Sequence, residues 1–416
     1  MDLDLRRLTG GKFTGFAALM ITVFINALND NFFRLILIFL AIRVYVTDGA
    51  GTFYYSLIGF VFLLPFVLFS PYAGFVGDRY SKKAVIVSTR LAEAVILMVA
   101  AVMLVLGNMP GLFVALFLMG LQSAFFSPVK FGILPEIVRE EGLSRANGQM
   151  QLWTFLAIIL GTALAGFIME WAGDALWIPA LVIVLLSILG LVASLFITPT
   201  EAEDDPPPFR LNAVADVKAA IGEIRHFRVL FLVVIGIAWF WALGTLYQLN
   251  VPLFAELELQ VGEMRTGIIL TVLAVGVGGG SIVAGHLAGD RIEMRHVPAG
   301  MIAVGVFSFL MRWAADSYAA TLVLSFLLGV GAGFFIVPIS AYLQNKSPAK
   351  RRARFIAASN ILAFSAMLVA PVIYWVITGP LGAAPSHIFV LSGIASMLVG
   401  VYTITLFWSV DLKGNE

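Results

Sequence analysis

The stretch Ala73-Gly74-Phe75-Val76-Gly77-Asp78-Arg79 ends one long apolar block, and a copy with one inserted residue, Ala284-Gly285-His286-Leu287-Ala288-Gly289-Asp290-Arg291, ends another. A second pair of segments repeats in the same way: Phe117-Leu118-Met119-Gly120, with Phe125, Phe126 and Pro128, matches Phe326-Leu327-Leu328-Gly329, with Phe334, Phe335 and Pro338. Both pairs are about 210 residues apart, as expected of a parallel duplication of helical spans. The chain therefore contains two related halves.

The composition indicates a chain that lies within a membrane. Of the 416 residues, 60% are hydrophobic and 12% are charged, more apolar surface than a soluble domain can bury. Blocks of about 20 apolar residues match a bilayer core of about 30 Å, and within it a backbone satisfies its own hydrogen bonds as a helix. We predict an all-α polytopic membrane protein with twelve spans, near 14–42, 53–77, 84–106, 110–127, 148–171, 176–197, 229–253, 265–289, 297–314, 318–343, 355–378 and 386–409.

Several classes of function are disfavoured by the same composition. A net charge of +1 lacks the basic excess of nucleic-acid-binding proteins, and a chain without cysteine has no disulfide or thiolate metal site. The four histidines show no metal-ligand spacing on one helix. The glycines of 276–280 lie inside an apolar span, where close helix packing is expected rather than dinucleotide binding. We expect no catalytic site, metal or cofactor.

The distribution of Lys and Arg predicts the orientation of the chain. The first apolar block runs for about 30 residues, too long for the core of a signal peptide, and is expected to be retained as a span. With the N-terminus inside, 21 of the 26 Lys and Arg residues fall on cytoplasmic segments. This bias predicts that both termini are cytoplasmic.

The longest connection separates the two halves. Residues 198–228 begin with an acidic, proline-rich run, and residues 211–227 then carry apolar positions at helical spacing with basic neighbours. The sequence predicts an N-terminal half over 1–197, a cytoplasmic linker with an interfacial helix over 198–228, and a C-terminal half over 229–416.

The first span carries an unusual set of polar residues. Asn26, Asp30 and Arg34 are spaced by four, so they share one helix face on which Asp30 can pair with Arg34, and Asn29 lies beside them. A lone charge in hydrocarbon costs about 2.5–3.5 kcal/mol, so these side chains should face the bundle or a wet cavity. A headgroup or ion site is the favoured interpretation; an internal kink with a paired charge is the alternative.

Two other spans place charges in apolar surroundings. Pro128 removes a backbone donor, which predicts that the fourth helix breaks there and that Lys130 projects near its cytoplasmic end. Lys130 could bind a phosphate or carboxylate, or be one more lysine of the positive-inside bias. Arg90 and Glu93, three residues apart in the third span, are expected to pair.

The seventh span combines aromatic and polar side chains. Tyr247 and Gln248, with Trp239, Trp241 and Asn250, could line a cavity that is partly polar. An aromatic belt with core packing explains the same residues equally well.

The segment Gly74-x-x-x-Asp78-Arg79-x-Ser81-Lys82-Lys83 resembles the loop motif between helices 2 and 3 of the major facilitator superfamily, which usually has glycine where Ser81 stands. The resemblance implies that superfamily's fold of twelve helices in two six-helix halves. It also implies conformational gating by Gly74, Asp78 and Arg79 and by the second copy, Asp290 and Arg291. Gly74 is expected to let two helices approach closely. A solvated loop is the alternative.

Two further segments resemble the bacterial lysophospholipid transporter family. They are Asn29-Asp30-Asn31-Phe32-Phe33 and Ser127-Pro128-Val129-Lys130-Phe131-Gly132-Ile133-Leu134, supported by Leu143-x-x-Ala146-Asn147-Gly148, Gly161 and Gly333-Phe334-Phe335-x-Val337-Pro338. The resemblance implies movement of lysophosphatidylethanolamine-like lipids from the outer to the inner leaflet of the bacterial inner membrane. There a partner acyltransferase and acyl-carrier-protein synthetase reacylate them.

The resemblance also assigns roles to individual residues. The acidic residue of helix 1 corresponds to Asp30, expected to contact a headgroup amine, and the lysine after helix 4 to Lys130, expected to receive the phosphate. Some members have an arginine on helix 7, which is missing near 245–248, and Arg34 is the candidate replacement. The acyl chain is expected to pass phenylalanines 32, 33, 125, 126, 334 and 335, although packing also explains them.

Two rival hypotheses remain open at this stage. The first is a proton-coupled exporter of a drug-like or siderophore-like solute, with Asp30 as the coupling carboxylate. The second is a membrane anchor for an acyltransferase.

Overall fold

A computed structural model describes residues 13–45, 51–139, 142–201, 221–288, 294–348 and 351–411. In these ranges every regular element is helical, and twelve of the helices are long and apolar enough to cross a membrane. The prediction of an all-α polytopic membrane protein with twelve spans is confirmed.

The helices before the long connection keep close to the predicted spans. They are α2 (Phe13–Tyr45), α3 (Gly51–Arg79), α4 (Lys82–Val105), α5 (Met109–Gly132), the short α6 (Leu134–Ile137), α7 (Leu143–Ala172) and α8 (Trp177–Leu195).

The helices after the connection do so as well. They are α10 (Arg228–Leu257), α11 (Glu263–Ala288), α12 (His296–Leu310) with the 3₁₀ turn η2 (Met311–Trp313), α13 (Tyr318–Lys346), α14 (Arg352–Thr378) and α15 (Pro385–Asp411).

The chain divides by its internal contacts into two compact units. One comprises Met1–Leu40 and Val61–Val214, and the other comprises Ala41–Phe60 and Ala215–Glu416. Most of the predicted linker and interfacial helix, and the predicted gating pair Asp290 and Arg291, fall outside the described residues. The division into halves at 198–228 stays a prediction.

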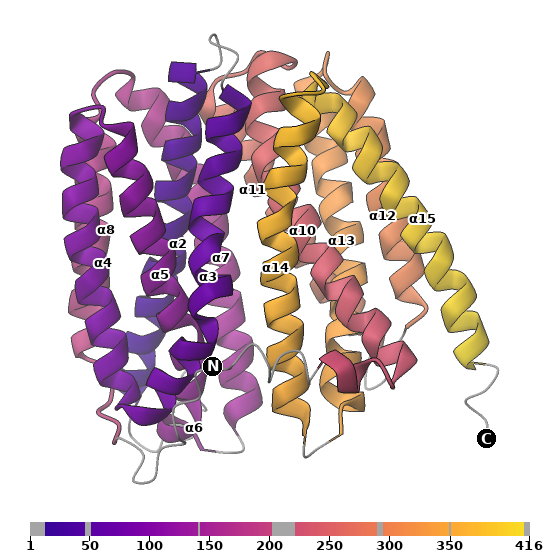
Figure 1. Ribbon diagram of the computed structural model, residues 1–416, viewed down its shortest axis with the longest axis horizontal. Coiled ribbons are helices and arrows are strands. Elements are labelled where there is room, and N and C mark those ends of the chain that lie inside the picture. The colour runs from indigo at the N-terminus through magenta and orange to yellow at the C-terminus, as the bar shows by residue number, and fades with distance from the viewer. Residues whose placement is uncertain are drawn as a thin grey trace. The chain divides into compact units, whose positions relative to one another are not determined.

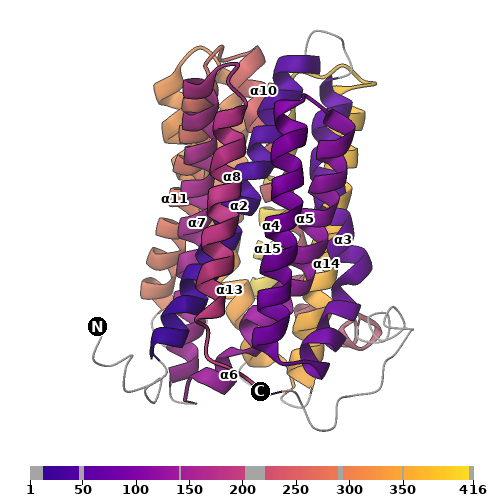
Figure 2. The ribbon, with the colours of Figure 1, turned by 90° about the vertical axis from the view of Figure 1, so that its left-hand side faces the viewer.

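Within the first unit, α4 lies beside both α5 and α8 (Figures 1 and 2). The packing of α2 on α7 requires a glycine, because a Cβ added at Gly161 would lie 2.6 Å from the carbonyl oxygen of Leu28. This contact holds the polar stretch of α2 close to the rest of the unit.

Within the second unit, α13 packs against α11 and α12, and α12 packs against α15 (Figure 1). A Cβ at Gly276 or Gly280 of α11 would overlap a backbone carbonyl of α13. Close helix packing was the predicted role of this glycine-rich segment, and it is confirmed.

The prediction that the fourth helix breaks at Pro128 is wrong. Helix α5 continues through Pro128 to Gly132, and the Ile133 amide still donates to the Val129 carbonyl at 3.0 Å. Proline removes one hydrogen bond of the ladder, and the neighbouring bonds and helix packing hold the remainder. Lys130 therefore lies on the last turn of a continuous helix.

Candidate functional site

The polar residues of α2 meet α5 at the carboxylate of Asp30. Oδ2 of Asp30 accepts one hydrogen bond from Nδ2 of Asn26 at 3.1 Å and another from Oγ of Ser123 on α5 at 2.8 Å. The first contact spans one turn of α2 and confirms that Asn26 and Asp30 share a helix face. The second joins two helices of the first unit.

A buried ion pair lies beside this contact. The guanidinium of Arg90 pairs with the Glu93 carboxylate one turn further along α4, as the spacing predicted, and both side chains are almost completely buried. The Glu93 carboxylate also accepts a hydrogen bond from Nδ2 of Asn29 at 3.0 Å. The pair thus ties α4 to α2.

Gln122 connects the ion pair to Asp30. Its Oε1 accepts from Nη2 of Arg90 at 2.6 Å, and its Nε2 donates to Oγ of Ser123 at 2.8 Å. Since Ser123 in turn donates to Asp30, one continuous chain of hydrogen bonds runs from α4 through α5 to α2. Such networks polarise each bond in the same sense and fix the side chains that take part.

Three buried acceptor atoms of this network have no hydrogen-bond partner among the described residues. They are Oδ1 of Asn26, Oδ1 of Asn29 and Oδ1 of Asp30. Buried polar atoms in proteins are nearly always bonded, so these oxygens can accept hydrogen bonds from a bound donor group or from water.

Arg34 lies one turn further along α2. Its Nη2 donates to Oδ1 of Asn31 at 2.7 Å, and its guanidinium carbon lies 5.3 Å from the ring centroid of Phe62. It also interacts electrostatically with Asp30, the partner that the sequence predicted.

Lys130 contributes a cation from the last turn of α5. Its ammonium lies 5.2 Å from the ring centroid of Phe131, and it interacts electrostatically with Asp30 and Arg90. Among the residues that the structure describes, it makes no hydrogen bond or ion pair. The residue as a whole is partly buried.

The charges of this site do not balance. By formal charge, three basic side chains, Arg34, Arg90 and Lys130, lie with two acidic ones, Asp30 and Glu93. With Arg90 paired to Glu93, the remaining anion, Asp30, faces two cations. A bound group with one negative charge would neutralise the cluster.

The polar residues of α10 lie in the second unit, away from this network in the chain. The Tyr247 hydroxyl is buried, 2.9 Å from Oγ of Ser308 and 3.2 Å from Oγ of Ser392. Asn250 donates to the Pro385 carbonyl at 3.1 Å, and Gln248 is partly buried between them. The Tyr247 hydroxyl therefore joins α10 to α12 and α15.

The loop motif surrounds the start of α4. Ser81, which stands where the motif usually has glycine, is the N-cap of α4 and accepts from the Ala84 amide. Asp78 and Arg79 end α3 and are exposed, and Arg79 stacks on the ring of Tyr80.

The expected close approach at Gly74 is not observed within the first unit. A Cβ added at Gly74 would meet no atom within 4 Å, whereas one added at Gly77 would lie 3.0 Å from Val129. Helices α3 and α5 instead approach closely at Gly120 of α5, where an added Cβ would lie 2.2 Å from the carbonyl oxygen of Phe62, because the crossing point of two helices decides where a small residue is needed.

Comparison with known proteins identifies the family. The family model of the Major Facilitator Superfamily matches residues 19–371. The chain belongs to this superfamily. It resembles the lysophospholipid transporter LplT of Salmonella heidelberg, with 30% identity over 364 residues, 85% of this chain and 86% of the relative. LplT of Photorhabdus laumondii is 29% identical over 332 residues, 79% of this chain and 80% of the relative. The resemblance noted in the sequence is confirmed.

Two solved structures share the fold of this chain. A POT family transporter in complex with 5-aminolevulinic acid has a TM-score of 0.74 at 13% identity, covering 94% of this chain and 95% of that one. The POT family transporter PepTSo gives 0.72 at 11% identity over 96% and 98% of the two chains. These likenesses establish the major facilitator fold.

Two residues of the network were missed in the sequence. Gln122 and Ser123 are adjacent polar residues inside the apolar fourth span, and this was the signal that could have identified them. Four of the six phenylalanines proposed to flank an acyl path are buried in the core, namely those at 32, 33, 126 and 335. Core packing, the alternative noted in the sequence, accounts for these four rings.

Proposed function

We propose that this superfamily transporter moves lysophospholipids across the bacterial inner membrane by binding the headgroup at Asp30 and Lys130. The observation that carries the proposal concerns Asp30 and Lys130, which interact electrostatically. One oxygen of the Asp30 carboxylate accepts no hydrogen bond, and the Lys130 ammonium makes no hydrogen bond or ion pair, among the described residues. The names of the LplT relatives support the choice of substrate.

The headgroup of lysophosphatidylethanolamine has the complementary chemistry. Its ammonium donates up to three hydrogen bonds, which matches the unpartnered oxygens of Asn26, Asn29 and Asp30. Its phosphodiester carries one negative charge, which matches the excess cation at Lys130. Arg34 is a second cation that, like Lys130, interacts electrostatically with Asp30.

The cost of holding these charges supports a functional site. A charged side chain near the centre of a span costs about 2.5–3.5 kcal/mol, and such residues usually mark substrate or ion pathways. Asp30 lies near the middle of α2 and bears this cost, and Lys130, on the last turn of α5, has no ion pair among the described residues. Binding a phosphate would supply the missing counter-charge.

Transport follows by alternating access between the two repeats. We propose that the lipid moves from the outer to the inner leaflet and that both chain termini are cytoplasmic. Asp78 and Arg79, with the copy at Asp290 and Arg291, act as the gating charges. The delivered lipid would then be available to a separate acyltransferase and acyl-carrier-protein synthetase for reacylation.

The test is movement of a tail-labelled lysophosphatidylethanolamine in liposomes that contain the purified protein. Loss of a hydrogen bond to a charged group costs about 1.5–3 kcal/mol, or about 10- to 100-fold in rate. We expect Lys130→Ala to slow movement by at least tenfold and Lys130→Arg to restore much of it. Lys346→Ala, at the exposed end of α13, is the matched control and should move lipid normally. Normal movement by Lys130→Ala would remove Lys130 from the mechanism.

A proton-coupled exporter is favoured by one observation. Oδ1 of Asp30 is buried and has no hydrogen-bond partner in the part of the chain that the structure describes, and a coupling proton could reside there. The two functions differ in their response to a proton gradient. Movement of lysophosphatidylethanolamine down its own gradient should be unchanged when the proton gradient is collapsed, whereas export of a soluble solute by proton exchange should stop.

A further inference from the structure

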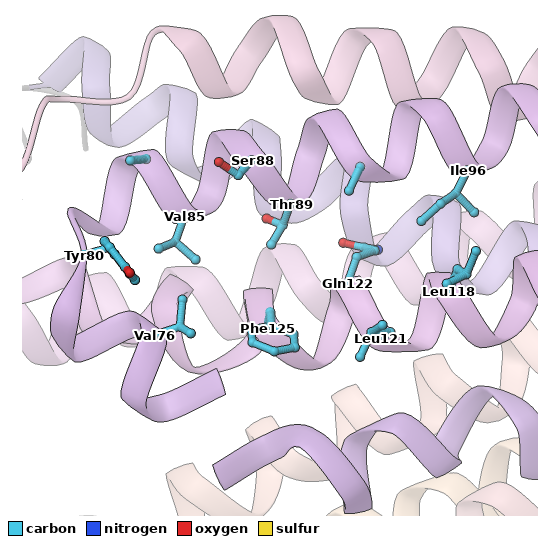
Figure 3. Close-up of a pocket in the computed structure, with 12 residues that line it drawn as sticks. Val76, Tyr80, Val85, Ser88, Thr89, Ile96, Leu118, Leu121, Gln122 and Phe125 are labelled. Carbon is cyan, nitrogen blue, oxygen red and sulfur yellow. The ribbon is translucent and has the colours of Figure 1, made fainter. Parts of the chain in front are cut away.

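A groove of about 550 Å³ lies between α4 and α5 at the end of the first unit where α3 turns into α4. Figure 3 shows its walls, which are mostly apolar and include Val76 of α3, Val85 and Ile96 of α4, and Leu118, Leu121 and Phe125 of α5. None of the described residues that line it is charged. Its volume falls within the roughly 300–1,000 Å³ of ordinary ligand sites.

The length of the groove fits one membrane leaflet. Its α4 wall extends from Ala84 to Ile96, which is about 18 Å at about 1.5 Å per residue. Half of a bilayer core of about 30 Å has nearly the same depth. Ala92 and Leu118 in the walls are exposed, so the groove is accessible from outside the protein. An exposed apolar groove on a membrane span is accessible to acyl chains.

Cations lie at one end of the groove. Tyr80 lines this end, and the guanidinium of Arg79 lies 5.9 Å from its ring centroid. Arg79 is exposed and makes no ion pair among the described residues. Lys82 begins α4 nearby and pairs with Glu136 at 2.5 Å. This loop region carries three cations, Arg79, Lys82 and Lys83, and two carboxylates, Asp78 and Glu136. Its net positive charge favours an anionic headgroup.

The groove also touches the Asp30 network. Gln122 lines it, and the same side chain accepts from Arg90 and donates to Ser123, which donates to Asp30 (Figure 3). Both polar atoms of Gln122 are used in these bonds, so the groove offers no unpartnered carboxamide to a substrate headgroup. A chain that fills the groove would instead hold Gln122 in its bonded position.

We propose that this groove binds one acyl chain of an anionic membrane phospholipid whose phosphate is held by Arg79 and Lys82. The bound lipid is a stabilising component, distinct from the transported molecule, and it keeps Gln122 in contact with Arg90 and Ser123. The cations at one end of the groove suit a phosphate, and the uncharged walls, which are about as long as one leaflet is deep, suit an acyl chain. Both features favour a resident phospholipid over the tail of a substrate whose headgroup binds at Asp30.

The experiment uses the full-length protein in lipid nanodiscs and two photoactivatable phospholipids with the same acyl chain, phosphatidylglycerol and phosphatidylcholine. Cross-linked residues are located by mass spectrometry. We expect phosphatidylglycerol to label the α4–α5 groove at least fivefold more strongly, and Arg79→Gln to remove that preference. Ala92→Trp, which fills the groove, should reduce labelling at least fivefold.

Val95→Trp is the matched control, because Val95 is exposed on the same helix and does not line the groove. It should label like the unmodified protein. Equal labelling by both lipids would overturn the proposal and mark an ordinary annular lipid. Displacement of the label by excess lysophosphatidylethanolamine would overturn it too and assign the groove to the substrate tail. Because labelling is read without transport, failure here leaves the proposed function to its own test.

Discussion

Removing Arg90 should destabilise the first unit strongly. The side chain is 1% exposed and touches three groups: the Glu93 carboxylate, Oε1 of Gln122 at 2.6 Å, and the Phe126 ring at 4.4 Å from its centroid. In Arg90→Leu, the Glu93 carboxylate would keep only the hydrogen bond from Asn29. Leaving one member of a buried pair uncompensated costs about 3–5 kcal/mol, and we expect the free energy of unfolding to fall by that amount.

A double variant separates the buried charge from the loss of packing. Replacing a buried pair by apolar residues of similar volume is often neutral, so Arg90→Leu with Glu93→Leu should recover at least about 2 kcal/mol of the loss. The hydrogen bonds to Asn29 and Gln122 are lost in both cases, which keeps recovery incomplete.

The free energy of unfolding can be measured in mixed micelles with increasing denaturing detergent, followed by tryptophan fluorescence. Arg312→Leu, at an exposed position in η2, is the matched control and should stay within about 0.5 kcal/mol of the unmodified protein. The reasoning would be refuted if the free energy of unfolding of Arg90→Leu lay within 1 kcal/mol of the control, or if the double variant were no more stable than Arg90→Leu alone.

Three further contacts can be tested by substitution. Gly161→Val should destabilise the protein, since even a Cβ there meets the backbone of α2, whereas Gly148→Val on the same helix meets nothing within 4 Å and should have little effect in the same unfolding assay. Tyr247→Phe should lower the free energy of unfolding by about 1–2 kcal/mol through lost hydrogen bonds and leave lipid movement per folded molecule unchanged; a selective loss of transport would show that Tyr247 takes part in substrate binding. Ser123→Ala should slow lysophosphatidylethanolamine movement by about tenfold, since the Asp30 carboxylate loses a hydrogen-bond donor, and an unchanged rate would show that this donor is dispensable.

The spans could be predicted because the membrane imposes a simple rule of length and polarity. Local pairs within one helix were predictable for the same kind of reason: Arg90 with Glu93 and Asn26 with Asp30 follow from helical spacing alone.

Contacts between helices could not be predicted in this way. Ser123 donates to Asp30 from 93 residues away, and only the packing of α5 on α2 brings the two together. The position of the close helix contact was missed for the same reason, since Gly74 and Gly120 are equally small and only the crossing of α3 and α5 places the contact at Gly120. Pro128 failed as a helix breaker because the neighbouring bonds and packing of α5 outweigh one lost bond.

The most direct test of headgroup binding uses the absence of cysteine from the chain. Ser127→Cys places a single thiol one turn before Lys130 on α5, at a partly buried position, and leaves Lys130 intact. We expect lysophosphatidylethanolamine to slow alkylation of this thiol several-fold, and the added change Lys130→Ala to abolish that protection. Alkylation at the same rate with and without the lipid would contradict a headgroup site at Lys130.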